Sequence, residues 1–194
     1  MQLKFVMLGL NFLIFSFVLK AQKIDTLDAR HLFIEMQHLH PGLRKYLVYS
    51  EDSVSRKRLG VFIWERNILP FKTDAKSIII KRKWYSYDSQ YLVRTIESVV
   101  DASTFLPILH HSAATAMHRP AFVEHYLFTP DSVYTAPIIS QKKFQLSLQQ
   151  SVYNWELDLE TFALFPLRKE KKFAIYFYPP ESATLPKCCE HSVE

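Results

Sequence analysis

Beyond residue 43 the chain repeats one pattern: short apolar segments of strand length, separated by turn-forming residues. Several of these segments alternate apolar and polar residues with a period of two, which is the period of a β-strand. β-branched and aromatic residues dominate them, as a pleated surface prefers. Strands joined by short turns pair antiparallel with their chain neighbours. The pattern therefore predicts a mainly β fold, an antiparallel meander curved into an open half-barrel.

The predicted strands cover residues 44–50, 59–66, 77–87, 91–100, 104–111, 121–129, 142–150, 153–163 and 172–178. Residues such as Asn67, Pro70 and Pro179-Pro180 mark the turns between them. Before the first strand, residues 24–40 are compatible with one short helix that Pro41-Gly42 ends.

Two of the predicted strands have informative faces. Within 153–163, Trp155 shares one face with Leu157 and Leu159, and the other face carries three carboxylates, Glu156, Asp158 and Glu160. Residues 173–178 are apolar on both faces instead. A strand of that kind needs cover on its second face, from a helix, a partner or a bound apolar ligand.

The amino terminus has the order of an export signal. Lys4 precedes an apolar run from Phe5 to Leu19, and a small residue, Ala21, follows. The run is shorter than the roughly 20 residues that span a bilayer. We therefore expect residues 1–21 to be a signal peptide and residues 22–194 a single β-rich domain in the periplasm or cell envelope. An uncleaved anchor and a buried core element are the alternatives.

Composition excludes several classes of function. Only Gly42 and Gly60 remain after residue 21, so a glycine-rich phosphate loop or dinucleotide fingerprint is absent. The formal net charge of +5 comes from interspersed charges, and we expect no nucleic-acid partner. The basic segments 56–58 and 169–172 suit at most peripheral contact with anionic lipid.

A resemblance rests on 154–162, 165–167 and 173–178, together with 46–49 and 59–62. These segments resemble uncharacterised secreted bacterial proteins, whose sheet is similar to the periplasmic half-barrel of lipoprotein carriers and related domains of unknown function. The resemblance covers residues 44–187 as a pattern and supplies no catalytic or ligand residue. Such relatives continue with further strands, so it implies a domain shortened at its carboxyl end, with an open edge strand.

Three clusters of side chains can each be interpreted either as a chemical site or as an ordinary structural feature. The carboxylates Glu156, Asp158 and Glu160 suit a hard cation or acid–base work, or form a solvated face that pairs with lysines. The histidines of 110–125, which are His110, His111, His118 and His125, suit zinc but match no known ligand spacing. The terminal pair Cys188-Cys189, with His191, suits a soft metal on a poor scaffold.

We therefore expect a non-enzymatic exported protein that binds an apolar ligand, such as a lipid or acyl chain, or a partner protein in the envelope. The residues expected to line its concave sheet are Phe62, Trp64, Trp84, Trp155 and Tyr176. No catalytic residue, metal or cofactor is assigned. One alternative is a metal-assisted hydrolase using the histidines of 110–125 or the carboxylates. The other is an assembly protein that acts through an open sheet edge.

Overall fold

A computed structural model describes residues 25–27, 34–72, 74–115, 122–135, 145–166, 172–179 and 187–192. These residues form one large sheet and one small sheet, with three short helical segments. The predicted signal peptide, residues 1–21, lies outside the described residues. Within them, no helix has the length and apolar character needed to cross a membrane.

The large sheet has eight strands in chain order, each antiparallel to the next. They are β2 (Gly42–Glu51), β3 (Arg58–Ile68), β4 (Ser77–Ser86), β5 (Leu92–Asp101), β6 (Pro107–Ala114), β7 (Phe122–Thr129), β8 (Ser132–Thr135) and β9 (Gln145–Ser147). Its two outer strands, β2 and β9, do not pair with each other, so the sheet is open. The predicted antiparallel meander is confirmed.

The small sheet was not predicted. It contains β1 (Asp25–Leu27), β10 (Tyr153–Asn154), β11 (Lys172–Tyr178) and β12 (Lys187–Ser192). β1 and β10 run parallel to β11, whereas β12 runs antiparallel to it. Parallel partners lie far apart in sequence, so turn signals, which report on neighbouring strands, cannot reveal them.

Two predictions of secondary structure are wrong. The predicted strand 153–163 is two residues of β10, the 3₁₀ segment η2 (Trp155–Leu157) and the helix α2 (Asp158–Leu164). The predicted helix over 24–40 is replaced by β1 and the 3₁₀ turn η1 (Met36–His38), with residues 28–33 outside the described part. The one short α-helix of the described residues therefore lies near the carboxyl end.

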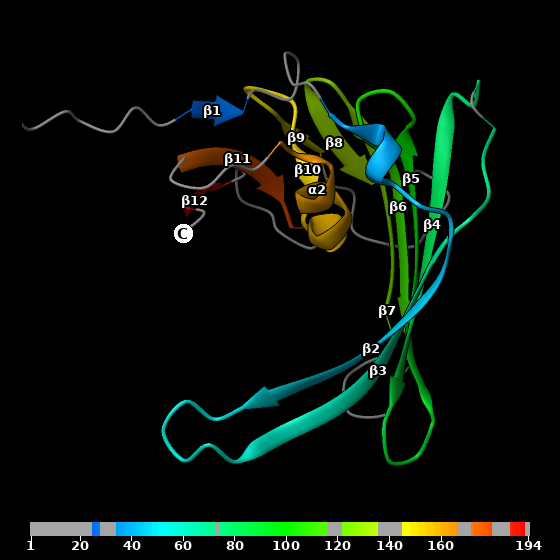
Figure 1. Ribbon diagram of the computed structural model, residues 1–194, viewed down its shortest axis with the longest axis vertical. Helices are drawn as coiled ribbons and strands as arrows, with labels where there is room; N and C mark the ends of the chain where they lie inside the picture. Colours follow the sequence, from blue (N-terminus) through cyan, green and yellow to red (C-terminus); the bar gives the residue numbers. More distant parts are fainter. Residues whose placement is uncertain are drawn as a thin grey trace, which may run out of the picture.

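Figure 1 shows the large sheet as a tall curved wall whose β2–β3 hairpin bends away from its base. α2, β10 and β11 lie against the upper part of the concave side, so the molecule has the outline of a C. Buried side chains of the sheet and of this α2–β11 module form two clusters. The first includes Ile80, Leu157 and Phe177, and the second includes Tyr126 and Tyr178.

At residues 175–178, the part of β11 whose side chains are described, both faces pack against other parts of the protein. Phe177 on one face contacts Tyr153, Trp155 and Phe162, with ring centroids 5.3–6.3 Å away. Tyr178 on the other face contacts the rings of Tyr126 and Phe128 from the large sheet. At these residues the cover that a doubly apolar strand requires therefore comes from Tyr153 of β10, from helical residues and from β7.

Candidate functional site

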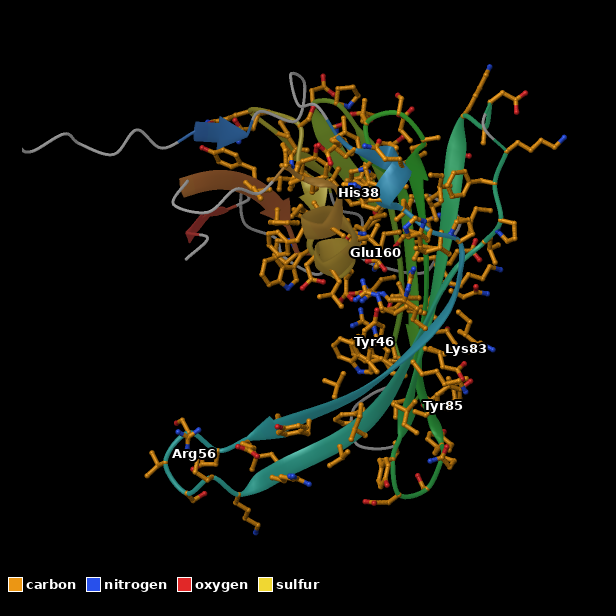
Figure 2. The ribbon with its side chains drawn as sticks, viewed as in Figure 1. His38, Tyr46, Arg56, Lys83, Tyr85 and Glu160 are labelled. Carbon is orange, nitrogen blue, oxygen red and sulfur yellow. The ribbon has the colours of Figure 1, made fainter. Side chains whose placement is uncertain are left out.

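The register of the large sheet arranges its concave face in rows that cross the strands. Tyr46 pairs with Trp64, Trp64 with Trp84, and Trp84 with Arg94, so β2 to β5 each supply one side chain to the first row. We call Tyr46, Trp64, Trp84 and Arg94 the aromatic row. In Figure 2 Tyr46 lies on the same side of the sheet as Glu160, whereas Lys83 and Tyr85 project from the opposite, convex side.

Three members of the aromatic row, Trp64, Trp84 and Arg94, are stacked on one another, and Tyr46 is the register partner of Trp64. The indoles of Trp64 and Trp84 are nearly parallel, with centroids 4.7 Å apart and planes 8° from each other. The guanidinium carbon of Arg94 lies 4.8 Å from the ring centre of Trp84, in a cation–π contact. Both indole Nε1–H groups are buried and have no acceptor among the described residues. The row therefore combines apolar area with two unpaired donors.

The next row, towards α2, is ionic and fully buried. Arg66 and Arg82 are directly paired across β3 and β4, and their exposed fractions are 2% and 3%. Arg66 makes a bidentate ion pair with Glu160 of α2, in which its Nε donates to Oε1 at 2.8 Å and its Nη2 donates to Oε2. Arg82 Nη2 donates to Glu156 Oε2 at 2.5 Å. The helical segment is thus tied to the sheet by charged pairs.

Arg94 links the two rows. Its Nε donates to Ser112 Oγ at 2.7 Å, and its Nη1 donates to Glu156 Oε1 at 3.2 Å. Glu156 therefore bridges Arg82 and Arg94. Burial lowers the pKa of Arg82 to about 10, against the opposing effect of Glu156, so the guanidinium stays charged at neutral pH.

Local sequence explains why a helix begins at this place. Asn154 Oδ1 accepts a hydrogen bond from the Glu156 N–H, which caps the first turn. Acidic side chains in the first turns suit the positive end of a helix dipole. The spacing of Leu157, Thr161 and Leu164 places three buried side chains on one helical face. The spacing of Glu156 and Glu160 likewise directs both carboxylates towards the arginines.

A buried polar group lies one row further up. The Nδ1 atom of His110, whose residue is fully buried, lies 3.1 Å from both Ser98 Oγ and Asn154 Nδ2. Because the Asn154 amide donates, Nδ1 accepts and the proton resides on Nε2. Burial, and next the charges of Arg82 and Arg94, lower the pKa of His110 to about 3. The imidazole is therefore neutral at physiological pH.

Residues 45–185, which are more than half of the chain, match the profile of a family described as a protein of unknown function, DUF3108. The chain belongs to that family. No curated protein and no solved structure matches it. The expectation of an uncharacterised family is confirmed, and the match assigns no chemistry to any residue of this DUF3108 protein.

The five residues predicted to line the concave sheet fall into two groups. Phe62, Trp64 and Trp84 lie on the concave face of β3 and β4 and are partly buried. Trp155 lies on η2, 41% exposed, and contacts Phe177. Tyr176 lies on β11 and packs against the second core cluster. The structure of this DUF3108 protein therefore brings together three of the five.

Gly60 allows Phe62 its position. A Cβ atom on Gly60 would lie 3.0 Å from the Phe62 ring, which is tighter than most Cβ contacts in proteins, so the ring would have to shift slightly. Because Gly60 has no side chain, the ring of Phe62 can lie close to the backbone of its own strand at residue 60.

The described histidines of the predicted cluster are divided between the two faces of the sheet. His110 is on the concave face, whereas His111 and His125 pair across β6 and β7 on the convex face, with ring centroids 5.4 Å apart. His118 lies outside the described residues. Within the described part of the chain, no group of three or more His, Cys, Asp or Glu is arranged to hold a metal ion.

The interpretation of the three carboxylates as a solvated strand face is wrong. Glu156 and Glu160 are helical and point to buried arginines, and Asp158 Oδ1 lies 3.9 Å from Arg66 Nη1. The arginines were missed altogether. Their signal was present, because Arg66 has the same parity as Phe62 and Trp64, and Arg82 the same parity as Ile80 and Trp84.

A cavity of about 210 Å³ lies at the far end of the sheet, apart from the aromatic row. It is lined by residues that include Asp101, Pro107, Phe128 and Val152, and by none of the five predicted residues. The candidate functional site is therefore the aromatic row, with the ionic row as its support.

Proposed function

We propose that this DUF3108 protein is a non-enzymatic, exported binding protein that holds an apolar ligand, such as a lipid or acyl chain, against its aromatic row. The observation that carries the proposal is the stacked pair of Trp64 and Trp84 on the concave face, with Tyr46 next to Trp64 in the register, because all three residues keep exposed surface there. Large aromatic side chains supply most of the contact area in apolar binding sites.

The change in burial between neighbouring rows supports this location. Arg66 and Arg82, under α2, are almost fully buried, whereas Trp64 and Trp84 one row away are only partly buried and Tyr46 is 36% exposed. Aromatic residues left open on a concave sheet expose apolar surface that a ligand removes from water.

Among the described residues, the groups considered for a hydrolase are arranged as structural contacts. The Ser98–His110 pair is fully buried, and the carboxylates of the helical segment neutralise arginines. A nucleophile and its base must reach a bound substrate, and these groups face the protein interior. The proposal therefore gives the aromatic row a role in contact and not in chemistry.

Tryptophan fluorescence tests the proposal, because the chain has only three tryptophans. The Trp155→Phe variant reports on Trp64 and Trp84 alone, and the matched Trp64→Phe/Trp84→Phe variant reports on Trp155 alone. A brominated fatty acid, which quenches on contact, is expected to quench the first variant saturably and to leave the second nearly unchanged. Equal quenching of the two variants, or quenching that never saturates, would contradict the proposal.

The export part of the proposal rests on residues 1–21 and on the resemblance to periplasmic half-barrels. Amino-terminal sequencing of the protein recovered from the periplasmic fraction is expected to begin at Gln22. Recovery from the cytosol with Met1 intact would contradict export and would leave the proposal of ligand binding unaffected.

A further inference from the structure

The edge strand β2 is unusually open for a strand of its length. Among the described residues it pairs only with β3, and nine of its ten residues are exposed. Soluble proteins usually shorten, cover or charge such an edge, because its free backbone groups invite pairing with another strand. β2 carries no proline, and its one irregularity with β3 lies at its end, between Ser50 and Glu51.

The direction of the free backbone groups follows from β3. The Leu69 N–H donates to Ile79 O, and the Tyr87 N–H donates to Val61 O, so odd-numbered residues of β3 direct their backbone groups towards β4. Alternate residues of a strand point to opposite edges, so even-numbered residues of β3 bond to the even-numbered residues opposite them in β2. The odd-numbered residues of β2 consequently present their N–H and C=O groups at the open edge.

The same odd-numbered residues form an apolar stripe on the convex face. Leu43, Leu47 and Tyr49 have exposed fractions of 56%, 61% and 51%. Lys45, between them, contacts Glu65 of β3 at 2.7 Å, so its charge is partly neutralised within the sheet. The edge thus offers backbone hydrogen bonds and apolar side chains together.

The charges of β2 identify the partner that fits. Its amino half is basic, with Arg44 and Lys45, and its carboxyl end is acidic, with Glu51. When β2 is laid antiparallel on a second β2 about Val48, Lys45 lies opposite Glu51 and Leu47 lies opposite Tyr49. A two-fold interface requires such self-complementarity, because one patch must fit itself. A strand of uniform charge would repel its copy.

We propose that two copies of this chain pair through antiparallel β2 edges centred on Val48, which joins two large sheets into one. The proposal does not rest on ligand binding, because it uses the backbone edge and the convex side chains of β2, although Tyr46 of the aromatic row lies on the same strand. Opposite residues at the centre form a pair without mutual hydrogen bonds, whose Cα atoms lie about 4.5 Å apart, within the range of a disulfide.

Light scattering after gel filtration of the purified protein measures the mass directly. The expected mass is that of two chains at concentrations of about 100 μM, falling towards one chain on dilution. Leu47→Glu is expected to weaken the dimer by about tenfold or more, because it brings carboxylates together at the paired edge. Val123→Glu is the matched control. Val123 is 46% exposed on the same convex face, but it lies on β7, where it pairs with Ala113 of β6, and not on the β2 edge, so this variant is expected to stay dimeric.

Cysteine crosslinking tests the register. In a background with Cys188 and Cys189 replaced by serine, Val48→Cys is expected to give a disulfide-linked dimer. Ser50→Cys is not, because two Ser50 residues lie more than about 10 Å apart in this register. A mass of one chain at every concentration, an unchanged dimer in Leu47→Glu, or equal crosslinking of the two cysteine variants would overturn the proposal. The first result would also favour a strand from a different protein as the occupant of the edge.

Discussion

At the scale of single residues, His110 shows how far burial alters chemistry. Its ring lies between Ser98 and Asn154, with no exposed surface. Burial is the largest cause of its lowered pKa, and the positive charges of Arg82 and Arg94 and the neighbouring His111 and His125 act in the same direction. At mildly acidic pH the unfolded chain binds a proton at His110 and the folded state does not. The stability of the fold therefore depends on the titration of this residue.

The sign of that coupling gives a prediction. Between the ordinary pKa of histidine, near 6.5, and the folded value of about 3, the unfolded state binds the proton and acid therefore destabilises the fold. We expect His110→Gln to be less stable than the wild type at pH 7. The difference should shrink by about 2–3 kcal/mol at pH 4.5, since each pH unit in this range is worth about 1.4 kcal/mol.

Urea denaturation at the two pH values measures this difference. Ser98→Ala is the matched control, because it removes a hydrogen-bond partner of His110 and keeps the imidazole, so its effect should vary little with pH. A difference between wild type and His110→Gln that is the same at both pH values would show that His110 is not the coupled group.

At the scale of elements, the sequence predicted the large sheet well and the helical segment wrongly. Successive strands with short turns leave few choices of pairing, so the meander follows from local pattern alone. Residues 155–160 alternate as a strand does, but the same letters place Glu156 and Glu160 one helical turn apart. Asn154, as a cap, was the signal that favours the helix.

The residues of the candidate site were likewise predicted in part. Trp64 and Trp84 were selected as large aromatic residues, and they do share one face. Parity relates Phe62 to Trp64 within β3, but only the register between β3 and β4 places Trp84 beside Trp64. Trp155 was assigned to that face only because its segment was read as a strand. The buried pairs of Arg66 and Arg82 depend on where the helical segment packs, 94 and 74 residues later in the chain, and no local pattern contains this information.

The cap residue offers an element-scale prediction. Asn154→Ala removes both the acceptor for the Glu156 N–H and the donor to His110 Nδ1, and should lower the free energy of unfolding by about 2 kcal/mol. Asn154→Ser keeps a capping oxygen and loses the amide donor, so an intermediate loss is expected. Thermal unfolding of the three proteins measures the order, and equal stability of the wild type and Asn154→Ala would argue against the cap.

At the scale of the whole molecule, ion pairs join the α2–β11 module to the large sheet. Arg66 is 2% exposed and Glu160 is 8% exposed, so removal of Glu160 leaves the buried Arg66 charge with only the more distant, partly exposed Asp158 at 3.9 Å as an ion-pair partner. By contrast, Lys81 and Glu97 on the convex face form a pair at 2.9 Å with both side chains well exposed. The two pairs have similar chemistry and very different surroundings.

Glu160→Ala is therefore expected to lower the free energy of unfolding by about 3–5 kcal/mol, the cost of breaking a buried pair. Glu97→Ala, the matched surface control, should cost less than about 1 kcal/mol. The double variant Arg66→Met/Glu160→Leu should recover much of the loss, because an apolar pair replaces two buried charges. Denaturant titrations compare all three, and similar losses for Glu160→Ala and Glu97→Ala would rule out this account.

The ionic row has a consequence for errors during folding. If β4 slipped by two residues along β3, every side chain would stay on its own face, and the apolar layers would tolerate the mistake. Arg82 would then no longer lie opposite Arg66, within reach of Glu156. A buried cation without its counterion raises the free energy of the misaligned sheet. The arginines therefore disfavour a shift in register that apolar side chains alone would tolerate.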